Sequence, residues 1–471
     1  MVTNIRFGTD GWRALIAEEF TFANAARCAQ GLSRYLKERG TADLGLVVGY
    51  DTRFLSAEFA ATVAGVCASE GINVLLCTKP APTPVVSYNV LHHNTAGAAI
   101  ITASHNPAQW NGFKFKPEYA GSATQDITDR LEAAIGELGP IDPAVIERGR
   151  ASELVSDLDP TPPYLASIAN QVDLAAIRKA GFSVVVDAMF GAGAGYLPQL
   201  LSGGKTTVEE LHGYPNPAFP GMEQPEPIAH NLTEIMTRIP EAGASVGIAL
   251  DGDADRVGII DERGQFITTL NVFSLLALYQ LENKGQRGAL VKGVTSSKML
   301  NKMGDMFGVD VHEMRVGFKN IGPKMTEVDA LIAGEESGGF AFRGHIPERD
   351  GILSGLYILE YMAVTGKTPS QLVEHLFDRV GAHYFHRRDV DFRAEDRDKI
   401  QEKVNNPALD CIGEFVVVGS DNIDGRRLHF EDGWIAARFS GTEPLLRIYA
   451  EANSPENVTK MLDAASEYLG V

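Results

Sequence analysis

The sequence predicts an α/β protein with three related mixed α/β domains and a distinct α+β fourth domain, which together surround a central cleft. The chain has 471 residues, too many for one hydrophobic core, and three or four domains are usual at this length. Strand-like apolar runs alternate with amphipathic helical stretches over most of the chain, a pattern typical of right-handed βαβ units. The last quarter instead groups its strand-like runs, which favours an antiparallel sheet.

The first predicted domain, residues 1–155, begins with a long helix. Apolar residues recur at helical spacing over residues 21–39, Thr21 is the expected N-cap, and Gly40 follows the end. A second helix is expected to open at Ser56. Three strand-like runs complete the unit, at residues 44–50, 72–77 and 97–102.

Three more domains follow from the same reasoning. The alternation restarts after the proline-rich passage 157–163, so a second domain is expected over residues 156–260 and a third over 261–370. The fourth, residues 371–471, is expected to pack a helix beside its strands. Strand-like runs in these domains lie at residues 182–187, 245–250, 288–293, 415–419, 433–439 and 445–452.

Composition excludes several classes of protein. Hydrophobic residues make up 44% of the chain and charged residues 22%, values typical of a folded globular protein. No apolar run reaches the roughly 20 residues that span a bilayer, and the start of the chain lacks signal-peptide features, so a cytoplasmic protein with no membrane partner is expected. The four cysteines show no CxxC spacing and are expected to be buried thiols.

The net charge restricts the ligands. A formal charge of -19 argues against a sequence-independent nucleic-acid binder, because such proteins need a basic surface. A phosphorylated ligand would meet the same long-range repulsion. Any phosphate site must therefore be a local cluster of arginine, lysine and backbone N–H groups.

The first candidate functional segment, Thr102 to Pro107, directly follows an apolar strand-like run. Loops at the carboxyl ends of strands are where open α/β sheets bind ligands, and Ser104 is the candidate nucleophile. A serine hydrolase is a poor alternative, because no GxSxG elbow surrounds this serine. Taken by itself, the hexapeptide is more readily interpreted as an Asn-Pro turn with a solvated serine.

The second candidate segment places three aspartates at alternate positions between two apolar runs. Asp251, Asp253 and Asp255 can converge on one hard cation, and folding alone does not favour that density of negative charge. An EF-hand is disfavoured, because Arg256 replaces the glycine required at its sixth position and strands flank the loop. Three carboxylates with open coordination positions suit Mg²⁺ shared with a phosphate oxygen.

Two glycine-containing loops follow later apolar runs. In the segment 334–339 the glycines would let the backbone approach a ligand, and Glu335 could accept hydrogen bonds from sugar hydroxyls. A surface loop is an equally good interpretation of that segment. In the segment 438–444, Arg438, two hydroxyl residues and the nearby Arg447 are the parts of a phosphate-binding nest.

In their order along the chain, five segments resemble the signature set of the α-D-phosphohexomutase family: FGTDGWRA, TASHNP, DGDADR, GEESGG and RFSGTEPLLRIY. The resemblance spans residues 7–449. It implies the family's four domains, three related and one different, and a phosphosugar mutase acting on phosphorylated hexoses. It also implies Mg²⁺ as cofactor, glucose 1,6-bisphosphate as activator, and a monomer or homodimer.

The resemblance further implies roles for single residues. Ser104 would carry the phosphoryl group and bind Mg²⁺ together with the three aspartates, and Lys114 would assist proton transfer. The segment HIPERDG is similar to a glucomutase segment, which implies a catalytic role for His345 and substrate binding by Arg349. The other expected substrate-binding residues are Arg13, His105, Arg256, Lys319, Glu335, Ser337, Arg438, Ser440, Gly441, Thr442 and Arg447.

The expected sugar depends on one departure from the family pattern. Mannomutase-type and glucosamine-mutase-type loops end in Ser-Gly-His, but Gly339 stands where that histidine would be. Because the loop is closer to that of phosphoglucomutases, a phosphoglucomutase is the leading expectation. The alternatives are a dual-specificity phosphomannomutase or a phosphopentomutase, a catalytically silent sugar-phosphate-binding protein, and a metal-dependent phosphatase.

Overall fold

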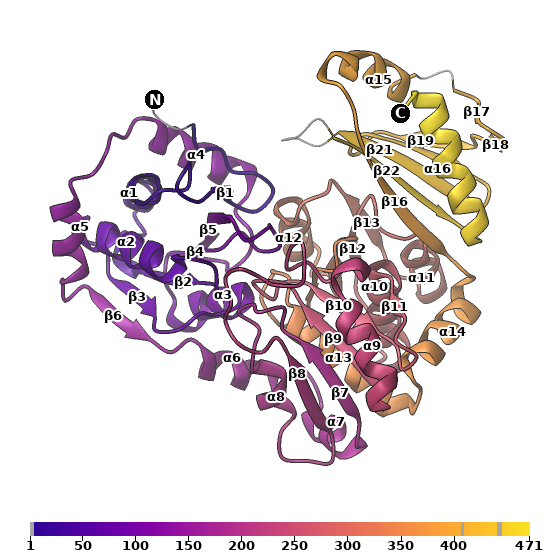
Figure 1. The fold of residues 1–471 in the computed structure, drawn as a ribbon, viewed down its shortest axis with the longest axis horizontal. Coiled ribbons are helices and arrows are strands. Elements are labelled where there is room, and N and C mark those ends of the chain that lie inside the picture. Colours follow the sequence, from indigo (N-terminus) through magenta and orange to yellow (C-terminus); the bar gives the residue numbers. More distant parts are fainter. Residues whose placement is uncertain (1–3, 407–408, 440–444) are drawn as a thin grey trace.

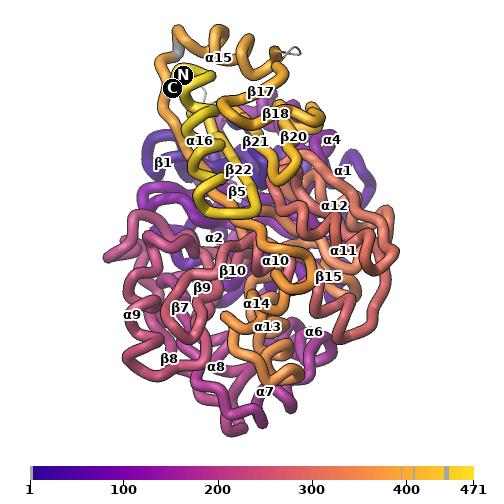
Figure 2. Tube along the Cα trace, turned by 90° about the vertical axis from the view of Figure 1, so that its right-hand side faces the viewer, coloured from indigo at the N-terminus to yellow at the C-terminus, as the bar shows by residue number. Residues whose placement is uncertain are grey.

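The computed structural model describes residues 4–406, 409–439 and 445–471. Its strands form four principal sheets in chain order and one two-stranded hairpin. In Figure 1 the first domain is the lobe at the left, the second and third domains pack beside each other, and the fourth forms the upper right lobe. Figure 2 places the fourth domain at one end of the molecule. No helix within these residues is long and apolar enough to cross a membrane.

The first sheet is mixed, with the strand order β1-β5-β4-β2-β3-β6. Strand β5 runs antiparallel to both of its neighbours, β1 and β4. Strands β4, β2, β3 and β6 are parallel to one another. The strands are β1 Trp12–Leu15, β2 Leu46–Tyr50, β3 Val74–Cys77, β4 Gly97–Ile101, β5 Trp110–Pro117 and β6 Val155–Leu158. The helices are α1 Phe22–Glu38, α2 Ser56–Ser69, α3 Thr83–His93, α4 Gln125–Gly136 and α5 Pro143–Arg150.

The predicted first helix and its cap are confirmed. The side chain of Thr21 accepts a hydrogen bond from the backbone N–H of Asn24 at 3.2 Å, and α1 follows directly. This bond satisfies one of the N–H groups that the first turn of a helix leaves unpaired. The second helix also opens at Ser56, as predicted.

The second sheet has the order β11-β10-β9-β7-β8. Its strands are β7 Ser183–Asp187, β8 Thr207–Leu211, β9 Val246–Leu250, β10 Val257–Ile260 and β11 Phe266–Ile267, with helices α6 Thr161–Ile168, α7 Leu174–Ala180, α8 Tyr196–Leu201 and α9 Thr233–Ala242. Strands β9 and β10 are antiparallel neighbours. The aspartate segment 251–256 is therefore the connection of a hairpin.

The third sheet has the order β13-β12-β14-β15. Its strands are β12 Leu290–Gly293, β13 Val311–Met314, β14 Ile332–Gly334 and β15 Phe340–Phe342, with helices α10 Thr269–Leu278, α11 Met299–Phe307, α12 Phe318–Glu327, α13 Gly351–Thr365 and α14 Pro369–Val380. Strands β14 and β15 are antiparallel. The segment 335–339 therefore also connects two paired strands.

The fourth domain differs from the others, as predicted. Its main sheet has five strands, all antiparallel, in the order β16-β22-β21-β20-β19. Its apolar core is separate from the large core cluster that runs through the first three domains. The elements are β16 Tyr384–Asp391, α15 Arg397–Val404, β17 Cys411–Ile412, β18 Phe415–Val416, β19 Gly419–Asp421, β20 Arg426–Phe430, β21 Gly433–Phe439, β22 Leu445–Ala452 and α16 Pro455–Leu469. The prediction of buried cysteines is wrong for Cys411, because it lies in the small β17–β18 hairpin and is exposed.

The domain boundaries stay predictions. Strand pairing in the first sheet extends to Leu158 and in the second to Ile267, a few residues past the predicted limits of 155 and 260. Helix α14 packs on α10 and α11 of the third domain and ends at Val380, beyond the predicted limit of 370. The largest apolar cluster runs through all three of the first domains, although the second and third also have smaller clusters of their own. Packing alone therefore sets no sharp division between the three domains.

Candidate active site

Ser104 lies just beyond the carboxyl end of β4, in a conformation unusual for its residue type. Its φ of 51° is in the left-handed region, which residues other than glycine seldom occupy. The Ser104 N–H donates to Oγ1 of Thr102 at 2.8 Å, and the residue is 1% exposed. Its hydroxyl donates to Oδ2 of Asp251 at 2.9 Å. The structure thus brings the predicted nucleophile to a predicted metal ligand.

The three aspartates converge in the connection between β9 and β10. Asp251, Asp253 and Asp255 are fully buried, and one carboxylate oxygen from each lies within 4.8 Å of the others. Gly252 permits this packing, because a Cβ at that position would lie 2.5 Å from the carbonyl oxygen of Ser104. The aspartate turn and the serine loop therefore meet backbone against backbone.

The aspartate oxygens fit a divalent cation. Oδ1 of Asp253 and Oδ1 of Asp255 are buried and accept no hydrogen bond from any described residue, although buried carboxylate oxygens are normally paired. Burial and repulsion from the other two aspartates raise the pKa of Asp251 well above its usual value. A hard cation such as Mg²⁺ would satisfy the unpaired oxygens and offset the repulsion. The acidic triad can therefore hold a metal ion.

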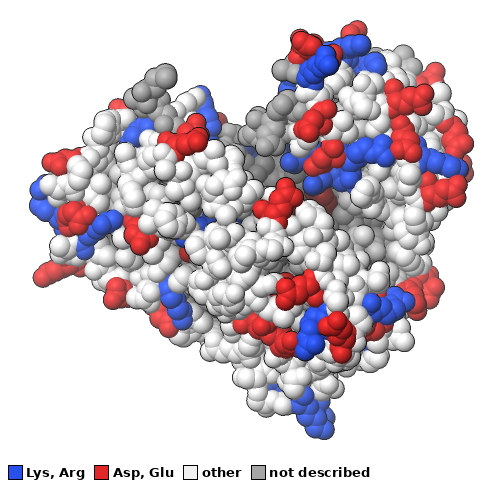
Figure 3. All heavy atoms as spheres, viewed as in Figure 1, with Lys and Arg blue, Asp and Glu red and all other residues white. Residues whose placement is uncertain are grey.

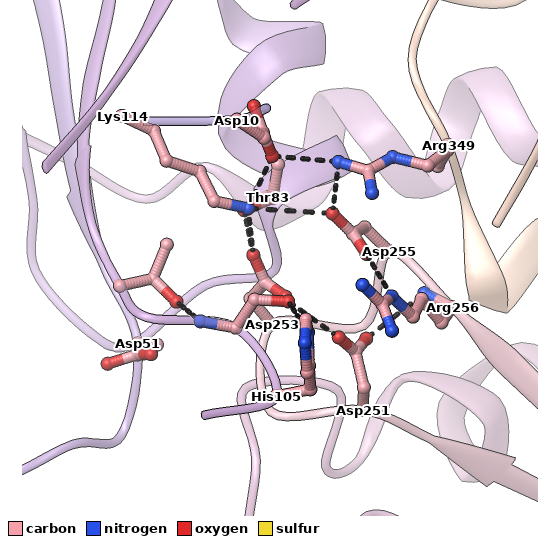
Figure 4. A network of polar contacts seen from close by, with 12 residues as sticks. Asp10, Asp51, Thr83, His105, Lys114, Asp251, Asp253, Asp255, Arg256 and Arg349 are labelled. Atoms are coloured by element: carbon pink, nitrogen blue, oxygen red, sulfur yellow. Dashed lines mark hydrogen bonds and ion pairs between the residues drawn. The ribbon is translucent and has the colours of Figure 1, made fainter. Parts of the chain in front are cut away.

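Lys114 is the central cation of this cluster (Figure 4). Side chains alternate along β5, which turns phenylalanines into the core and lysines toward the aspartates. Nζ of Lys114 lies 2.8 Å from Asp10, 2.7 Å from Asp253 and 3.5 Å from Asp255. Burial lowers the pKa of Lys114, but the three carboxylates together raise it well above its usual value. Lys114 is therefore held as an ammonium ion.

Two predicted substrate-binding arginines lie beside the same cluster. Arg13, on β1, donates from Nη1 to Oδ1 of Asn106 in the serine loop at 2.5 Å. Arg256 donates from its backbone N–H to Oδ1 of Asp251 at 3.0 Å and pairs its guanidinium with Glu226 at 2.7 Å. The Arg13 guanidinium thus contacts the serine loop, and Nε of Arg256 lies 3.9 Å from Oδ1 of Asp255 in the aspartate turn.

His105 adds an uncharged ring beside the serine. Its Nδ1 lies 3.4 Å from Oγ of Ser104. Burial and the neighbouring cations Arg256 and Arg13 lower the pKa of His105 well below its usual value. The imidazole is therefore neutral and can exchange a hydrogen bond with a group on Ser104.

Arg349 links the aspartates to the predicted sugar-binding loop. Its Nη2 lies 2.7 Å from Asp10 and 2.8 Å from Asp255, and its Nη1 lies 3.9 Å from Oε2 of Glu335. Ser337 is half-buried in the same loop. One guanidinium therefore lies between Glu335 of the predicted sugar-binding loop and Asp255 of the aspartate turn.

Gly339 makes room for this arginine. A Cβ at position 339 would collide with Cδ of Arg349. A larger residue at 339 and the observed placement of Arg349 therefore exclude each other. The departure from Ser-Gly-His noted in the sequence has a direct structural consequence.

A pH-dependent stability is expected from Glu335. Burial raises the pKa of its carboxyl from the usual value of 4.5 to about 7, even though Arg349 and the N–H of Gly317 favour the charged form. Between these pH values the folded protein binds a proton that the unfolded chain has released. The free energy of unfolding should therefore fall as pH rises through this window, by about 3 kcal/mol in total.

The variant Glu335→Gln should lose this part of the pH dependence. Urea unfolding is measured at about pH 4 and about pH 8, and the variant should gain stability relative to wild type only at the higher value. Glu327→Gln, at an exposed glutamate of α12, is the control and should follow wild type throughout. Parallel profiles for Glu335→Gln and wild type would contradict the assignment.

Two predicted residues lie away from these groups. His345 is buried, with Nε2 2.9 Å from Oδ2 of Asp350, and its ring stacks on Tyr88 and meets the edge of Tyr164. The predicted catalytic role gains no support from these contacts, which place the ring in an aromatic cluster beside the N-cap of α13. Lys319 donates to the carbonyl of Gly8 at 3.2 Å and to Gln125 at 2.8 Å, so it ties the third domain to the first.

The fourth domain presents the two arginines of the predicted phosphate-binding nest on one face of its sheet. Arg438 and Arg447 are cross-strand partners in β21 and β22, and Asp389 of β16 lies opposite Arg447. Arg438 pairs with Asp424 at 2.9 Å, whereas Nε of Arg447 is 4.0 Å from Asp389. Figure 3 shows basic side chains on this domain beside the notch that separates it from the first domain. Three other predicted residues, Ser440, Gly441 and Thr442, lie outside the described residues.

Comparison with known proteins decides the family. Models of the phosphoglucomutase/phosphomannomutase family match in order along the chain: alpha/beta/alpha domains I, II and III match residues 4–140, 162–264 and 271–380, and the C-terminal domain matches residues 393–467. The chain belongs to the phosphoglucomutase/phosphomannomutase family. This membership makes it a phosphohexomutase, an isomerase-type phosphotransferase, as the resemblance implied.

Relatives of this mutase share its full length. A "Phosphoglucomutase/phosphomannomutase" of Thermococcus kodakarensis is 34% identical over 98% of both chains. A "Probable phosphoglucosamine mutase" of Pyrococcus furiosus is 30% identical over 98% of this chain and 96% of the relative. A solved structure of a "putative phosphomannomutase" from Thermus thermophilus has a TM-score of 0.88 at 36% identity, covering 100% of both chains.

Sequence reasoning missed several residues of the mutase site. Asp10 contacts Lys114, Lys116 and Arg349, and Lys116 also pairs with Glu348 at 2.6 Å. The alternation of side chains along a strand could have identified Lys116, because residues 114 and 116 point to the same face of β5. The others depend on contacts between segments that are distant in the sequence. The remaining missed residues are Arg53, which contacts the serine loop, and Thr83, whose hydroxyl donates to Asp253.

Proposed function

We propose that this mutase interconverts glucose 1-phosphate and glucose 6-phosphate through a phosphoserine at Ser104 and a glucose 1,6-bisphosphate intermediate. The observation that carries the proposal is the 2.9 Å hydrogen bond from the Ser104 hydroxyl to Asp251, inside a buried triad of aspartates. A serine beside a metal site and several cations is suited to phosphoryl transfer, which needs positioning and charge neutralisation more than covalent assistance.

The reaction exchanges two P–O bonds. In the first half, the bond from phosphorus to the Ser104 oxygen breaks and a bond to a free sugar hydroxyl oxygen forms, while the sugar oxygen loses a proton and the serine oxygen gains one. Lys114, which lies among Asp10, Asp253 and Asp255, is the group we assign to assist this proton transfer from the sugar oxygen to the serine oxygen. Arg13 and Arg256 would stabilise the charge on the transferred group. Bound at the triad, Mg²⁺ would neutralise part of that charge.

The bisphosphate then reorients, and the second half returns a phosphoryl group to Ser104. Glucose 1,6-bisphosphate would act as activator by restoring the phosphoserine whenever an intermediate escapes. We propose, in line with the sequence analysis, that the protein works in the cytoplasm as a monomer or homodimer.

Preference for glucose is supported by the third-domain loop. Gly339 leaves the space that Arg349 fills, and Arg349 approaches Glu335, which we assign with Ser337 to the sugar hydroxyls. Relatives bear the names of phosphomannomutases and phosphoglucosamine mutases as well. A phosphomannomutase or a dual-specificity phosphohexomutase is therefore the main alternative. A phosphopentomutase is a further alternative, and the assay described next also detects that activity.

One assay separates these functions. The purified protein is incubated with Mg²⁺, catalytic glucose 1,6-bisphosphate and, in turn, the 1-phosphates of glucose, mannose, glucosamine and ribose. We expect 6-phosphate isomer from glucose 1-phosphate with the highest kcat/KM. Preference for mannose or glucosamine would reassign the sugar, ribose 5-phosphate would indicate a pentomutase, and release of free phosphate would indicate a phosphatase. If no product forms from any of these sugar phosphates, the protein is a catalytically silent sugar-phosphate-binding protein.

The fourth domain should hold the phosphate that does not react. A mutase binds its sugar in two orientations, so this contact must serve both isomers. Arg447→Ala should raise KM for glucose 1-phosphate and for glucose 6-phosphate by similar factors of about 10- to 100-fold. This factor corresponds to the loss of one charge-assisted hydrogen bond, which contributes about 1.5–3 kcal/mol. It should also release more glucose 1,6-bisphosphate per turnover, because the intermediate loses its anchor while it reorients.

The control for this variant is Arg393→Ala, at an exposed arginine of the same domain. It should leave both KM values and bisphosphate release unchanged. An effect of Arg447→Ala on one isomer alone, without extra bisphosphate, would show that Arg447 does not serve a shared distal site.

A further inference from the structure

The side chain of Arg53 gathers the backbone carbonyls of the serine loop. Its Nη2 donates to the carbonyl oxygens of Ser104 and Asn106 at 2.6 and 2.5 Å. Its Nη1 donates to those of Pro107 and Trp110 at 2.9 and 3.1 Å. The side chain is fully buried. One guanidinium therefore satisfies the carbonyls of three residues in the loop that carries Ser104 and of Trp110, the first residue of the following strand β5.

An arginine is the side chain suited to this task. Its planar fork offers five N–H donors in fixed directions, whereas a lysine offers one rotatable ammonium on a flexible stem. The carbonyl of Ser104 faces this fork while the residue itself has a φ of 51°. A left-handed conformation costs about 1–2 kcal/mol for a residue with a side chain and persists only where the surroundings enforce it.

Further contacts hold Arg53 itself in place. Asp51 forms an ion pair with Nε of Arg53 at 3.2 Å and accepts its backbone N–H at 3.0 Å. Oδ1 of Asp51 also accepts the hydroxyl of Ser56 at 2.8 Å, and Oγ1 of Thr102 accepts the N–H of Ser104. The ring of Phe219, from the second domain, covers the guanidinium at 5.0 Å. The arginine is thus enclosed between the serine loop, Asp51 and a neighbouring domain.

We propose that Arg53 is a positioning residue for phosphoryl transfer, which fixes Ser104 in the left-handed conformation that directs its hydroxyl to Asp251. Arg53 acts through the backbone, since its donors are engaged by carbonyls and not by reacting atoms. The inference rests on the proposed role of Ser104 as phosphoryl carrier. Loss of the guanidinium should misplace the serine oxygen while leaving the sugar-binding groups of the third and fourth domains intact.

The test compares two Arg53 variants with a matched control. Arg53→Lys keeps the charge but cannot serve four carbonyls, so kcat should fall about 10- to 100-fold, the cost of a displaced reacting group, with KM for glucose 1-phosphate within about twofold of wild type. The double variant Asp51→Asn with Arg53→Met removes the ion pair as a whole, which avoids an unpaired buried charge. Its kcat should fall at least as far as that of Arg53→Lys.

The control is Arg27→Lys. Arg27 is also buried and donates to the carbonyls of Leu138 and Ile135 at the end of α4. This variant should lower the melting temperature but leave kcat unchanged. A kcat within about twofold of wild type in either folded Arg53 variant would overturn the proposal, as would an equal loss of kcat in Arg27→Lys.

Mass analysis of phosphopeptides separates this inference from the proposed function. If active wild-type protein carries no phosphate on Ser104 during turnover, the phosphoserine mechanism itself fails. If wild-type Ser104 is phosphorylated but the Arg53 variants keep full kcat, only the positioning role fails. The expected result is phosphorylated wild-type protein and slow, folded Arg53 variants.

Discussion

Replacing Ser104 with alanine should lower kcat by at least about 10³-fold, because both halves of the proposed cycle use this oxygen and loss of a covalent nucleophile is among the largest single effects in catalysis. Stability should change by only about 1–2 kcal/mol, since the folded protein loses the contacts of one hydroxyl, with Asp251 and with His105. The measurements are steady-state isomerisation with added glucose 1,6-bisphosphate, and urea unfolding of the same preparations.

Ser87→Ala is the matched control for this variant. Ser87 is a buried serine of α3 whose hydroxyl has no hydrogen-bond partner among the described residues, so its removal should leave kcat at the wild-type value. Intact-mass analysis should show phosphate on wild type and none on Ser104→Ala. An active Ser104→Ala enzyme with phosphate at another residue would refute the mechanism.

The second large effect is expected for Lys114→Met. The change leaves the carboxylates of Asp10, Asp253 and Asp255 without their shared cation, and breaking a buried ion pair costs about 3–5 kcal/mol. If Lys114 also moves a proton, kcat should fall about 10²-fold or more. Urea unfolding and steady-state kinetics of folded protein measure the two effects separately.

A second buried lysine tests whether the loss of kcat is specific. Lys292 of β12 is fully buried, and its ammonium group lies against Glu313 and the carbonyl of Ser297. Lys292→Met should therefore lower stability but preserve kcat. If Lys114→Met raises KM alone and leaves kcat intact, Lys114 contributes uniform substrate binding and not proton transfer.

Local patterns in the sequence were sufficient for the architecture. The helix after Thr21 and the strand-like runs around residues 46–50, 97–101 and 246–250 appear close to where periodicity predicted them. Such elements follow from the period of apolar residues and from capping, which act over a few neighbouring positions. The antiparallel fourth domain was likewise predicted from its closely spaced strands.

The candidate site was only partly predictable. Ser104 and the alternating aspartates were found because short motifs at strand ends carry recognisable chemistry. Asp10 was missed, because its role depends on contacts with residues far away in the sequence. It pairs with Lys114 and Lys116 of β5 and with Arg349 of the loop before α13. His345 was placed near the chemistry by resemblance, whereas packing puts its ring against Tyr88 and Tyr164.

The sequence by itself determined the order of the domains, the serine and aspartate loops and the family resemblance, because each depends on residues that are neighbours along the chain. Only the tertiary structure decided which charges meet: Lys114 with Asp10 and Asp253, and Arg53 with the carbonyls of the serine loop. The physical reason is that a buried charge or polar group must find a partner wherever the fold supplies one. Those partners come from distant segments of the chain, and local sequence patterns do not predict which distant residues come into contact.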